Sequence, residues 1–559
     1  MSAISVTAVE STRRPHGWLN GWRLGVLAVA LIVALPVLTV FGFFLQPATE
    51  AWQHLVQTAL HDYVVNSLLL MLGVGAGTLL LGVSTAWVSA TCEFPGRRVF
   101  EWALLLPMAI PAYIIAYTYT GLLDFAGPVQ GALRELFGWG YGDYWFPNVR
   151  SLPGAMVMLS LVLYPYVYLL ARAAFLEQSV CVLEVSRTLG ATPMHTFMRV
   201  ALPMARPAIV AGLLLALMET LADYGTVQFF GVSTFTTGIF RTWFGLGDAV
   251  AAAQLSALLM SFVFVLILLE RWSRRQARYH ETGARMKSLP RHRLEGWRMA
   301  VGLAVCIVPL AFGFLLPAGQ LLVWVVRTAG RMLDADFLRI TGNSLVLAGS
   351  GALVTLLVGL FMAYGKRLHG DRLVQGAVRV AGMGYAIPGT VIAIGVMIPF
   401  AWLDNTVDAW MRARFDVSTG LLLSGTLVAL LFAYMVRFLA VALQTVEAGL
   451  AKIRPSMDEA ARALGLGPLD VLKKVHVPML RGSLITAMLL VFVDVLKELP
   501  ATLVLRPFNF NTLAVRTYEL AADERLADAA SASLAIVLAG IIPVILLSQS
   551  LSRTRIRYE

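Results

Sequence analysis

The chain has 559 residues, of which 58% are hydrophobic and 14% are charged, whereas an ordinary soluble domain has roughly 25% charged residues. Its mean hydropathy is +0.74. This composition excludes a soluble globule, whose surface needs more charge, and a disordered chain, which is poor in apolar residues. The net charge of +11 agrees with basic loops on one side of a membrane, and we expect no nucleic-acid partner. The composition therefore predicts a polytopic protein embedded in a lipid bilayer.

Twelve apolar segments are long enough to cross a bilayer, since one helical span needs about 20 apolar residues. In chain order they lie near residues 22–45, 64–90, 100–122, 152–176, 205–228, 248–270, 298–327, 342–365, 376–402, 419–446, 481–503 and 528–550. All are expected to be helices, because lipid offers the backbone no hydrogen-bond partners and the runs lack the alternation of barrel strands.

Basic residues predict the orientation of these spans. The stretch between the sixth and seventh segments, residues 271–298, is densely basic, and Arg553, Arg555 and Arg557 close the chain. By contrast, residues 46–62 contain no Lys or Arg. Because cytoplasmic loops carry the excess of Lys and Arg, both termini and the basic stretch are predicted to be cytoplasmic.

The chain also contains an internal repeat. The residues NSLL at 66–69 recur as NSLV at 343–346, and AIP at 109–111 recurs at 386–388, with an offset of 277 in both cases. Further along, the offset becomes 275. We therefore expect two six-span units that face the same way and are related by a pseudo-twofold axis along the membrane normal.

The repeat predicts three parts. Residues 1–270 form a first half, residues 271–298 form a basic linker, and residues 299–559 form a second half. The expected fold is all-α and polytopic, with about 12 transmembrane helices.

The strongest repeated motif follows the fourth span of each half. It reads LEVSRTLGATPMHTFMRVALP at residues 183–203 and DEAARALGLGPLDVLKKVHVP at residues 458–478. In both copies Glu precedes Gly by six residues, and Gly precedes Pro by thirteen. Gly can end a helix in the left-handed conformation, and the prolines at 193 and 468 suit the first turn of the next helix. Each copy is predicted to form two short helices, which we call an elbow, on the cytoplasmic side.

The two elbows resemble the EAA loop of ABC importer permeases, which docks on the ATPase subunit. The matching residues are Glu184, Gly190 and Pro203 in the first copy, and Glu459, Ala460, Ala461, Gly465 and Pro478 in the second. The first copy departs from the pattern with Val185 and Ser186 in place of the two alanines. The resemblance covers both halves and implies two tandem units of the type I, MetI-like permease fold.

Within that family, residues 219–245 and 497–519 are similar to the fused ferric-iron permeases of bacteria. The fused permeases for thiamine and phosphonates have a similar plan, so these substrates stay open as alternatives. The resemblance implies a permease subunit of a binding-protein-dependent importer in the bacterial inner membrane. It would form the translocation pathway and meet a periplasmic or lipid-anchored substrate-binding protein.

The chain contains no G-x-x-x-x-G-K-[ST] nucleotide loop. We therefore expect no catalytic residues and no cofactor in this chain. The resemblance implies two copies of a separate ABC ATPase, which would bind ATP and Mg. An ion-coupled secondary transporter is the rival class, but such a transporter has no need of elbows that dock an ATPase.

Four carboxylates lie at membrane depth: Glu219 and Asp223 near the end of the fifth span, and Asp494 and Glu498 near the end of the eleventh. Ionisable residues inside spans are costly and are candidates for function. Each pair is separated by four residues, so both members share one helix face. We predict that they line the translocation pathway and hold ferric iron transiently, since hard cations prefer oxygen ligands. Local pairing with Lys497, or capping of a helix that ends before Pro500, stays open as the alternative.

Overall fold

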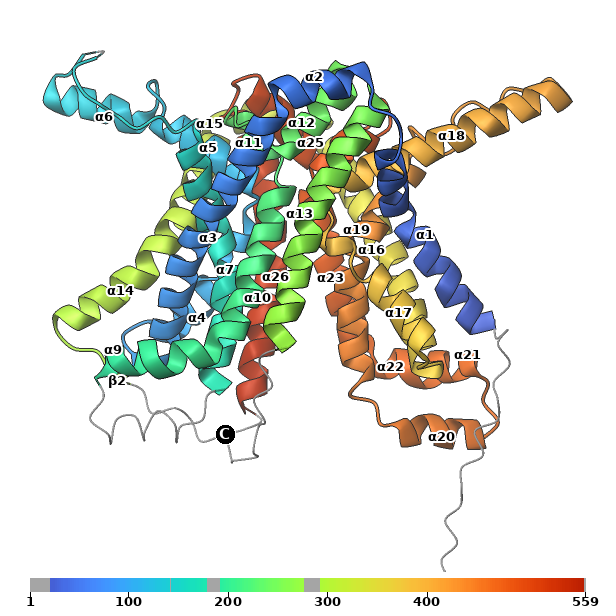
Figure 1. Ribbon diagram of the computed structural model, residues 1–559. Helices are drawn as coiled ribbons and strands as arrows, with labels where there is room; N and C mark the ends of the chain where they lie inside the picture. Colours follow the sequence, from blue (N-terminus) through green and yellow to red (C-terminus); the bar gives the residue numbers. More distant parts are fainter. Residues whose placement is uncertain (1–20, 141, 178–191, 276–291, 557–559) are drawn as a thin grey trace, which may run out of the picture.

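The computed structural model describes residues 21–140, 142–177, 192–275 and 292–556 (Figure 1). The helices before residue 276 are α1 (Gly21–Phe44), α2 (Glu50–Thr58), α3 (Leu60–Thr91), α4 (Arg97–Ala103), α5 (Ala112–Leu123), α6 (Pro128–Phe137), α7 (Leu152–Glu177), α9 (Pro193–Thr196), α10 (Leu202–Ala222), α11 (Gly225–Phe229), α12 (Phe235–Phe240) and α13 (Ala249–Arg275). Short 3-10 or π turns accompany them at η1 (Leu106–Ala109), η2 (Phe197–Ala201) and η3 (Arg241–Gly245).

The helices after residue 291 are α14 (Trp297–Leu310), α15 (Leu316–Met332), α16 (Ala335–Leu368), α17 (Arg372–Ala381), α18 (Gly389–Phe415), α19 (Leu427–Leu450), α20 (Pro455–Ala463), α21 (Pro468–Val471), α22 (Val477–Met479), α23 (Arg481–Lys497), α24 (Pro500–Leu505), α25 (Leu513–Ala522) and α26 (Ala530–Ile556). They are accompanied by η4 (Ala311–Leu315), η5 (Gly384–Ala386) and η6 (Leu472–His476). Two short strands, β1 (Cys92–Glu93) and β2 (His292–Arg293), pair in parallel.

Most of the predicted spans are present as long apolar helices. Among the described residues, nine helices are long and apolar enough to cross a membrane, and eleven segments qualify if two bent helix pairs are counted as single spans. A shorter apolar helix, Ala530–Ile545, corresponds to the twelfth predicted segment. The predicted all-α polytopic fold is therefore confirmed. Residues 276–291 of the predicted linker lie outside the described residues, and the division into parts at residues 270 and 299 stays a prediction.

The third and ninth predicted spans, residues 100–122 and 376–402, are interrupted rather than straight. The chain bends by 90° between Arg97–Ala109 and Ala112–Phe137. The bend lies at Pro111, whose ψ of 144° takes the backbone out of the helical region and whose nitrogen has no hydrogen to donate to the preceding turn. The repeated Pro388 likewise precedes a new helix, α18.

The fifth and eleventh predicted spans were expected to run to residues 228 and 503, and this expectation is wrong. Helix α10 ends at Ala222 and α23 ends at Lys497. The next residue in each case, Asp223 or Glu498, has extended backbone with ψ of 132° or 120°. Both spans therefore stop short at a carboxylate, and a separate short helix, α11 or α24, follows.

The first helix of the chain packs against the second half. Trp22 stacks on Phe361 of α16, with ring centroids 5.3 Å apart, and Arg23 pairs with Asp371 beside α17 at 3.3 Å. The backbone of α1 also crosses α18 so closely that a Cβ built on Gly395 would collide with the Pro36 carbonyl. In Figure 1 the blue α1 accordingly lies beside the yellow and orange helices α16, α17 and α18.

The first helix of the second half packs against the first half in return. A Cβ on Gly313 of η4 would lie 2.8 Å from the carbonyl oxygen of Leu161 in α7. The Tyr119 hydroxyl donates to the Phe312 carbonyl at 2.6 Å, and α14 lies beside α3 in Figure 1. The first helix of each half therefore packs against the other half. The largest buried cluster accordingly includes residues of both halves.

We predict that two chains divided at Gly283, when co-expressed, will still assemble, because the crossed helices and the shared core supply the packing. Co-purification through a tag on one half measures this assembly. The same experiment with Gly395→Leu in the second half tests the contact between α1 and α18. The leucine side chain should push the two helices apart and lower the yield of the complex. Halves that insert but never associate would show that the linker itself has a structural role.

Candidate functional site

The elbow of the second half has the predicted form. Helix α20 ends just before Gly465, whose φ of +82° is left-handed, and Pro468 begins α21. The segment then turns into α23 with a bend of 79°, and Pro478 lies in α22. Glu459 and Ala460 are exposed, whereas Ala461 is buried against the body of the protein.

Only part of the first elbow can be compared with the second. Glu184 and Gly190 lie outside the described residues, whereas Pro203 lies in the first turn of α10. In the repeat, Trp87 of the first half corresponds to Tyr364 near the end of α16 in the second half. Trp87 packs on Phe197, with ring centroids 4.8 Å apart. The described part of the first elbow therefore rests on aromatic packing.

A polar clamp of Arg367, Asp458 and His476 holds the second elbow. The Asp458 carboxylate accepts a hydrogen bond from Arg367 Nε at 2.8 Å and lies 2.6 Å from His476 Nε2. The same guanidinium donates to the carbonyls of Leu450 and Ile453 at 2.5 and 2.9 Å. Burial alone would raise the pKa of Asp458, but the hydrogen bonds from Arg367 and His476 outweigh it and hold the pKa below its usual value. The clamp thus joins α16, the end of α19, α20 and η6.

Sequence reasoning singled out Glu459 and missed its neighbour Asp458. The two acids are adjacent in the sequence, and only the structure shows that one is exposed while the other is buried. At the positions equivalent to the clamp, the first half has Ala90, Leu183 and Ala201. The clamp residues therefore occur in the second half alone.

The outward face of the second elbow presents two exposed leucines. Leu464 is 82% exposed and Leu469 is 55% exposed, and both flank the turn at Gly465. These leucines and the exposed carboxylate of Glu459 are side chains that a docked protein could contact. The elbow lies at the lower end of the molecule in Figure 1, opposite the arms formed by α6 and by the outer part of α18.

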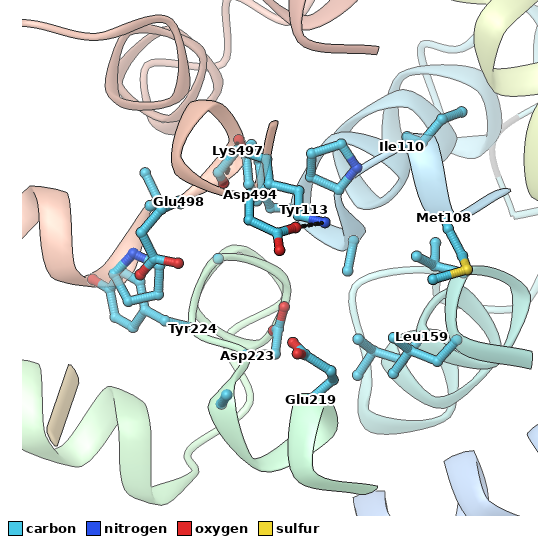
Figure 2. A pocket seen from close by; sticks show the side chains of 18 of the residues that line it. Met108, Ile110, Tyr113, Leu159, Glu219, Asp223, Tyr224, Asp494, Lys497 and Glu498 are labelled. Atoms are coloured by element: carbon cyan, nitrogen blue, oxygen red, sulfur yellow. Dashed lines mark hydrogen bonds and ion pairs between the residues drawn. The ribbon is translucent and has the colours of Figure 1, made fainter. Parts of the chain in front are cut away.

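The four predicted pathway carboxylates line one cavity between the two halves (Figure 2). This cavity has a volume of about 130 Å³, and its walls include α7 and α10 of the first half and α19 and α23 of the second. Glu219, Asp223, Asp494 and Glu498 all contribute to the lining. The structure therefore brings together residues that are 275 positions apart; their role in transport stays a prediction.

The second-half carboxylates both have cationic partners. Asp494 pairs with Lys497 at 2.8 Å, and Glu498 pairs with Arg437 of α19 at 3.3 Å. Glu498 Oε1 also accepts a hydrogen bond from the Ala501 N–H at 3.2 Å, which caps α24. Arg437 was missed at the sequence level, although an arginine inside an apolar run is itself a signal of function.

Within the described residues, the first-half carboxylates form no such ion pairs. Asp223 accepts hydrogen bonds from the Thr226 and Val227 N–H groups, each at 3.1 Å, and so caps α11. Within the part of the chain that the structure describes, Glu219 has no hydrogen-bond or ion-pair partner. The alternative of local pairing and capping thus describes three of the four carboxylates, and Glu219 is the exception.

Tyrosine hydroxyls join the two halves at this cavity. Tyr166 and Tyr385 lie 3.4 Å apart, and Tyr224 and Tyr518 lie 3.2 Å apart. In the described residues no group of three or more His, Cys, Asp or Glu side chains is close enough to hold a metal ion. The carboxylates are therefore spread along the cavity wall and do not form a ready-made metal cage.

Known proteins share both the sequence and the duplication. The family model of the binding-protein-dependent transport system inner membrane component matches residues 78–279 and again residues 355–558. The chain is 26% identical to Fe(3+)-transport system permease protein FbpB 2 of Haemophilus influenzae, over 96% of this chain and 99% of that protein.

Two further relatives show the range of the similarity. The ferric transport system permease protein FbpB of Actinobacillus pleuropneumoniae is 21% identical over 85% of this chain and 70% of its own length. The molybdenum transport system permease protein ModB of Escherichia coli K12 is 24% identical over 36% of this chain and 87% of its own length. Two matched units, a helical membrane fold and a doubled elbow motif lead to one conclusion: the chain belongs to the binding-protein-dependent transport system inner membrane components, the permeases of ABC importers.

Proposed function

We propose that this chain is the permease through which ferric iron crosses the bacterial inner membrane. The observation that carries the proposal is the cavity between the halves, lined by four carboxylates from the ends of two broken spans. Carboxylate oxygens are the ligands that a hard trivalent cation prefers. The near full-length similarity to a protein named as an Fe(3+)-transport permease supports the same cargo.

The energy for transport comes, in this proposal, from two copies of a separate ABC ATPase that bind ATP and Mg. One ATPase docks on each elbow, and the exposed Glu459, Leu464 and Leu469 provide the contact on the second elbow. Both termini and the elbows then face the cytoplasm, as the basic residues predict. A periplasmic or lipid-anchored binding protein delivers iron to the opposite face.

Iron passes the cavity by weak, successive contacts. A cation that is bound too tightly would not leave, so conduction favours several moderate sites over one cage. Two carboxylates one helical turn apart lie about 6 Å from each other along the axis, from a rise of about 1.5 Å per residue. Glu219 is the first candidate ligand, because its carboxylate forms no hydrogen bond or ion pair within the described residues.

We expect Glu184→Arg and Glu459→Arg, combined in one chain, to weaken ATPase recruitment, because each places the wrong charge at an elbow contact. Co-purification of the ATPase with the tagged permease measures recruitment. Glu50→Arg, an exposed site at the start of α2 on the face opposite the elbows, is the control. An undiminished yield of ATPase with the double variant would remove these residues from the docking surface.

The clamp generates a second prediction. Asp458→Asn removes the charge that Arg367 and His476 share, and we expect a local loss of about 2 kcal/mol, since hydrogen bonds to charged groups are worth about 1.5–3 kcal/mol. Amide exchange in α20 should then become roughly 30-fold faster. Asp470→Asn is the matched control, because its partner Lys474 is exposed at 64% and surface pairs contribute little. Equal exchange in both variants would contradict the clamp.

Glu219→Gln tests the cavity with one change. We expect iron uptake to fall by about tenfold or more, because the amide cannot supply a negative ligand, while the ion pairs of Asp494 and Glu498 stay intact. Uptake of radioactive iron by cells of equal permease content is the measurement, and Glu135→Gln on the exposed α6 is the control. Replacing all four carboxylates by amides should abolish uptake. Wild-type uptake in that quadruple variant would remove the carboxylates from the pathway and weaken the iron assignment.

A further inference from the structure

The cavity is asymmetric in charge although the two halves are repeats. At the offset of 275, Arg437 corresponds to Val162 and Lys497 corresponds to Ala222. The packing supports this register, since Gly82 lies against Val167 and Gly359 lies against Ala442. Both Val162 and Ala222 line the same cavity as Arg437 and Lys497. The first half therefore contributes acids alone, and the second half contributes acids together with cations.

Two of the four cavity carboxylates have a basic partner. Lys497 pairs with Asp494 at 2.8 Å, and Arg437 pairs with Glu498 at 3.3 Å. Asp494 is therefore compensated before any cargo arrives, and a cation that binds to Asp494 must displace the ammonium.

The side chains of the two basic residues, Arg437 and Lys497, differ in how freely they can move. The Arg437 side chain is 9% exposed, and that of its partner Glu498 is 6% exposed. Glu498 also caps α24, so this pair is part of the fixed wall. The Lys497 side chain is 32% exposed, lies at the end of α23 and has a flexible stem. Lys497 is thus the cation that can move when cargo arrives.

We propose that Lys497 is a tethered counter-cation that occupies the Asp494 site in the empty cavity and makes the site selective for highly charged cations. The inference rests on the proposed function. A monovalent ion gains no more attraction from Asp494 than the ammonium that it displaces, whereas a trivalent ion at the same distance gains about three times as much. Lys497 therefore excludes sodium and potassium, which surround the membrane in large excess, and returns to Asp494 when iron leaves. Arg437 holds Glu498 in place throughout.

The test measures ferric-iron uptake in proteoliposomes that contain the full permease and its ATPase, with iron-loaded binding protein outside. Potassium chloride and choline chloride are compared at equal ionic strength, so that screening is the same in both. Wild-type uptake should be equal in the two salts. Lys497→Gln should be inhibited about tenfold by potassium, because Asp494 is left without its partner. Lys366→Gln is the control, since Lys366 pairs with Glu447 at the same 2.8 Å outside the cavity.

A double variant that removes both charges of the pair completes a double-mutant cycle. Asp494→Asn alone leaves the ammonium free beside Glu219 and should lower uptake in both salts. The double variant Lys497→Gln with Asp494→Asn should lose the sensitivity to potassium, because the carboxylate for which potassium competes is gone, while its uptake stays below that of the wild type. Equal uptake of Lys497→Gln in both salts, or a double variant that stays as sensitive to potassium as Lys497→Gln, would overturn the counter-cation. Wild-type vesicles that take up no iron would instead overturn the proposed function.

Discussion

The structure depends on the cost of burying charge where lipid and apolar side chains leave no water to solvate it. The cavity carboxylates lie where α10 and α23 end, and each of those ends begins a new short helix. The N–H groups at the start of a helix have no partner within it. Asp223 and Glu498 accept hydrogen bonds from these groups at α11 and α24. The break in the span and the carboxylate therefore stabilise each other, and a straight helix through this region would leave the acid unsolvated.

Several features followed from the sequence because they depend on local chemistry or on repetition. Long apolar runs became spans, and the paired motif became an elbow with Gly465 in the left-handed region. The ends of α10 and α23 did not follow, because hydropathy reports whether a residue suits lipid and not where a helix turns. The bend at Pro111 was signalled by the proline itself, yet the surrounding run is apolar on both sides and so resembles one continuous span.

The partners of residues on distant helices could not be predicted from the sequence, for a different reason. The repeat reveals two equivalent halves but not which half each first helix contacts, since α1 beyond Arg23 is apolar on all sides and suits lipid or protein equally. Arg437 and Asp458 are each a single letter in the sequence. Their partners, Glu498 and Arg367, lie on other helices. The second half carries both of these buried polar networks, whereas its repeat partner has Val162 and Leu183 at the same places, so the two copies differ in the polar groups that they bury.

The crossed first helices have a consequence for how the protein is made. Helix α1 is translated long before Gly395 and the rest of α18. At about 5–20 residues per second, the intervening chain takes on the order of 20 to 70 s to emerge. During that time α1 lacks its contacts with α16, α17 and α18, although α13 of its own half, against which Phe41 stacks on Phe264, is already made. It is the most hydrophobic of the nine candidate spans in the described residues, so lipid can cover the rest of its surface. Assembly of the protein then includes a docking step in which α18 closes over a helix that entered the membrane long before it.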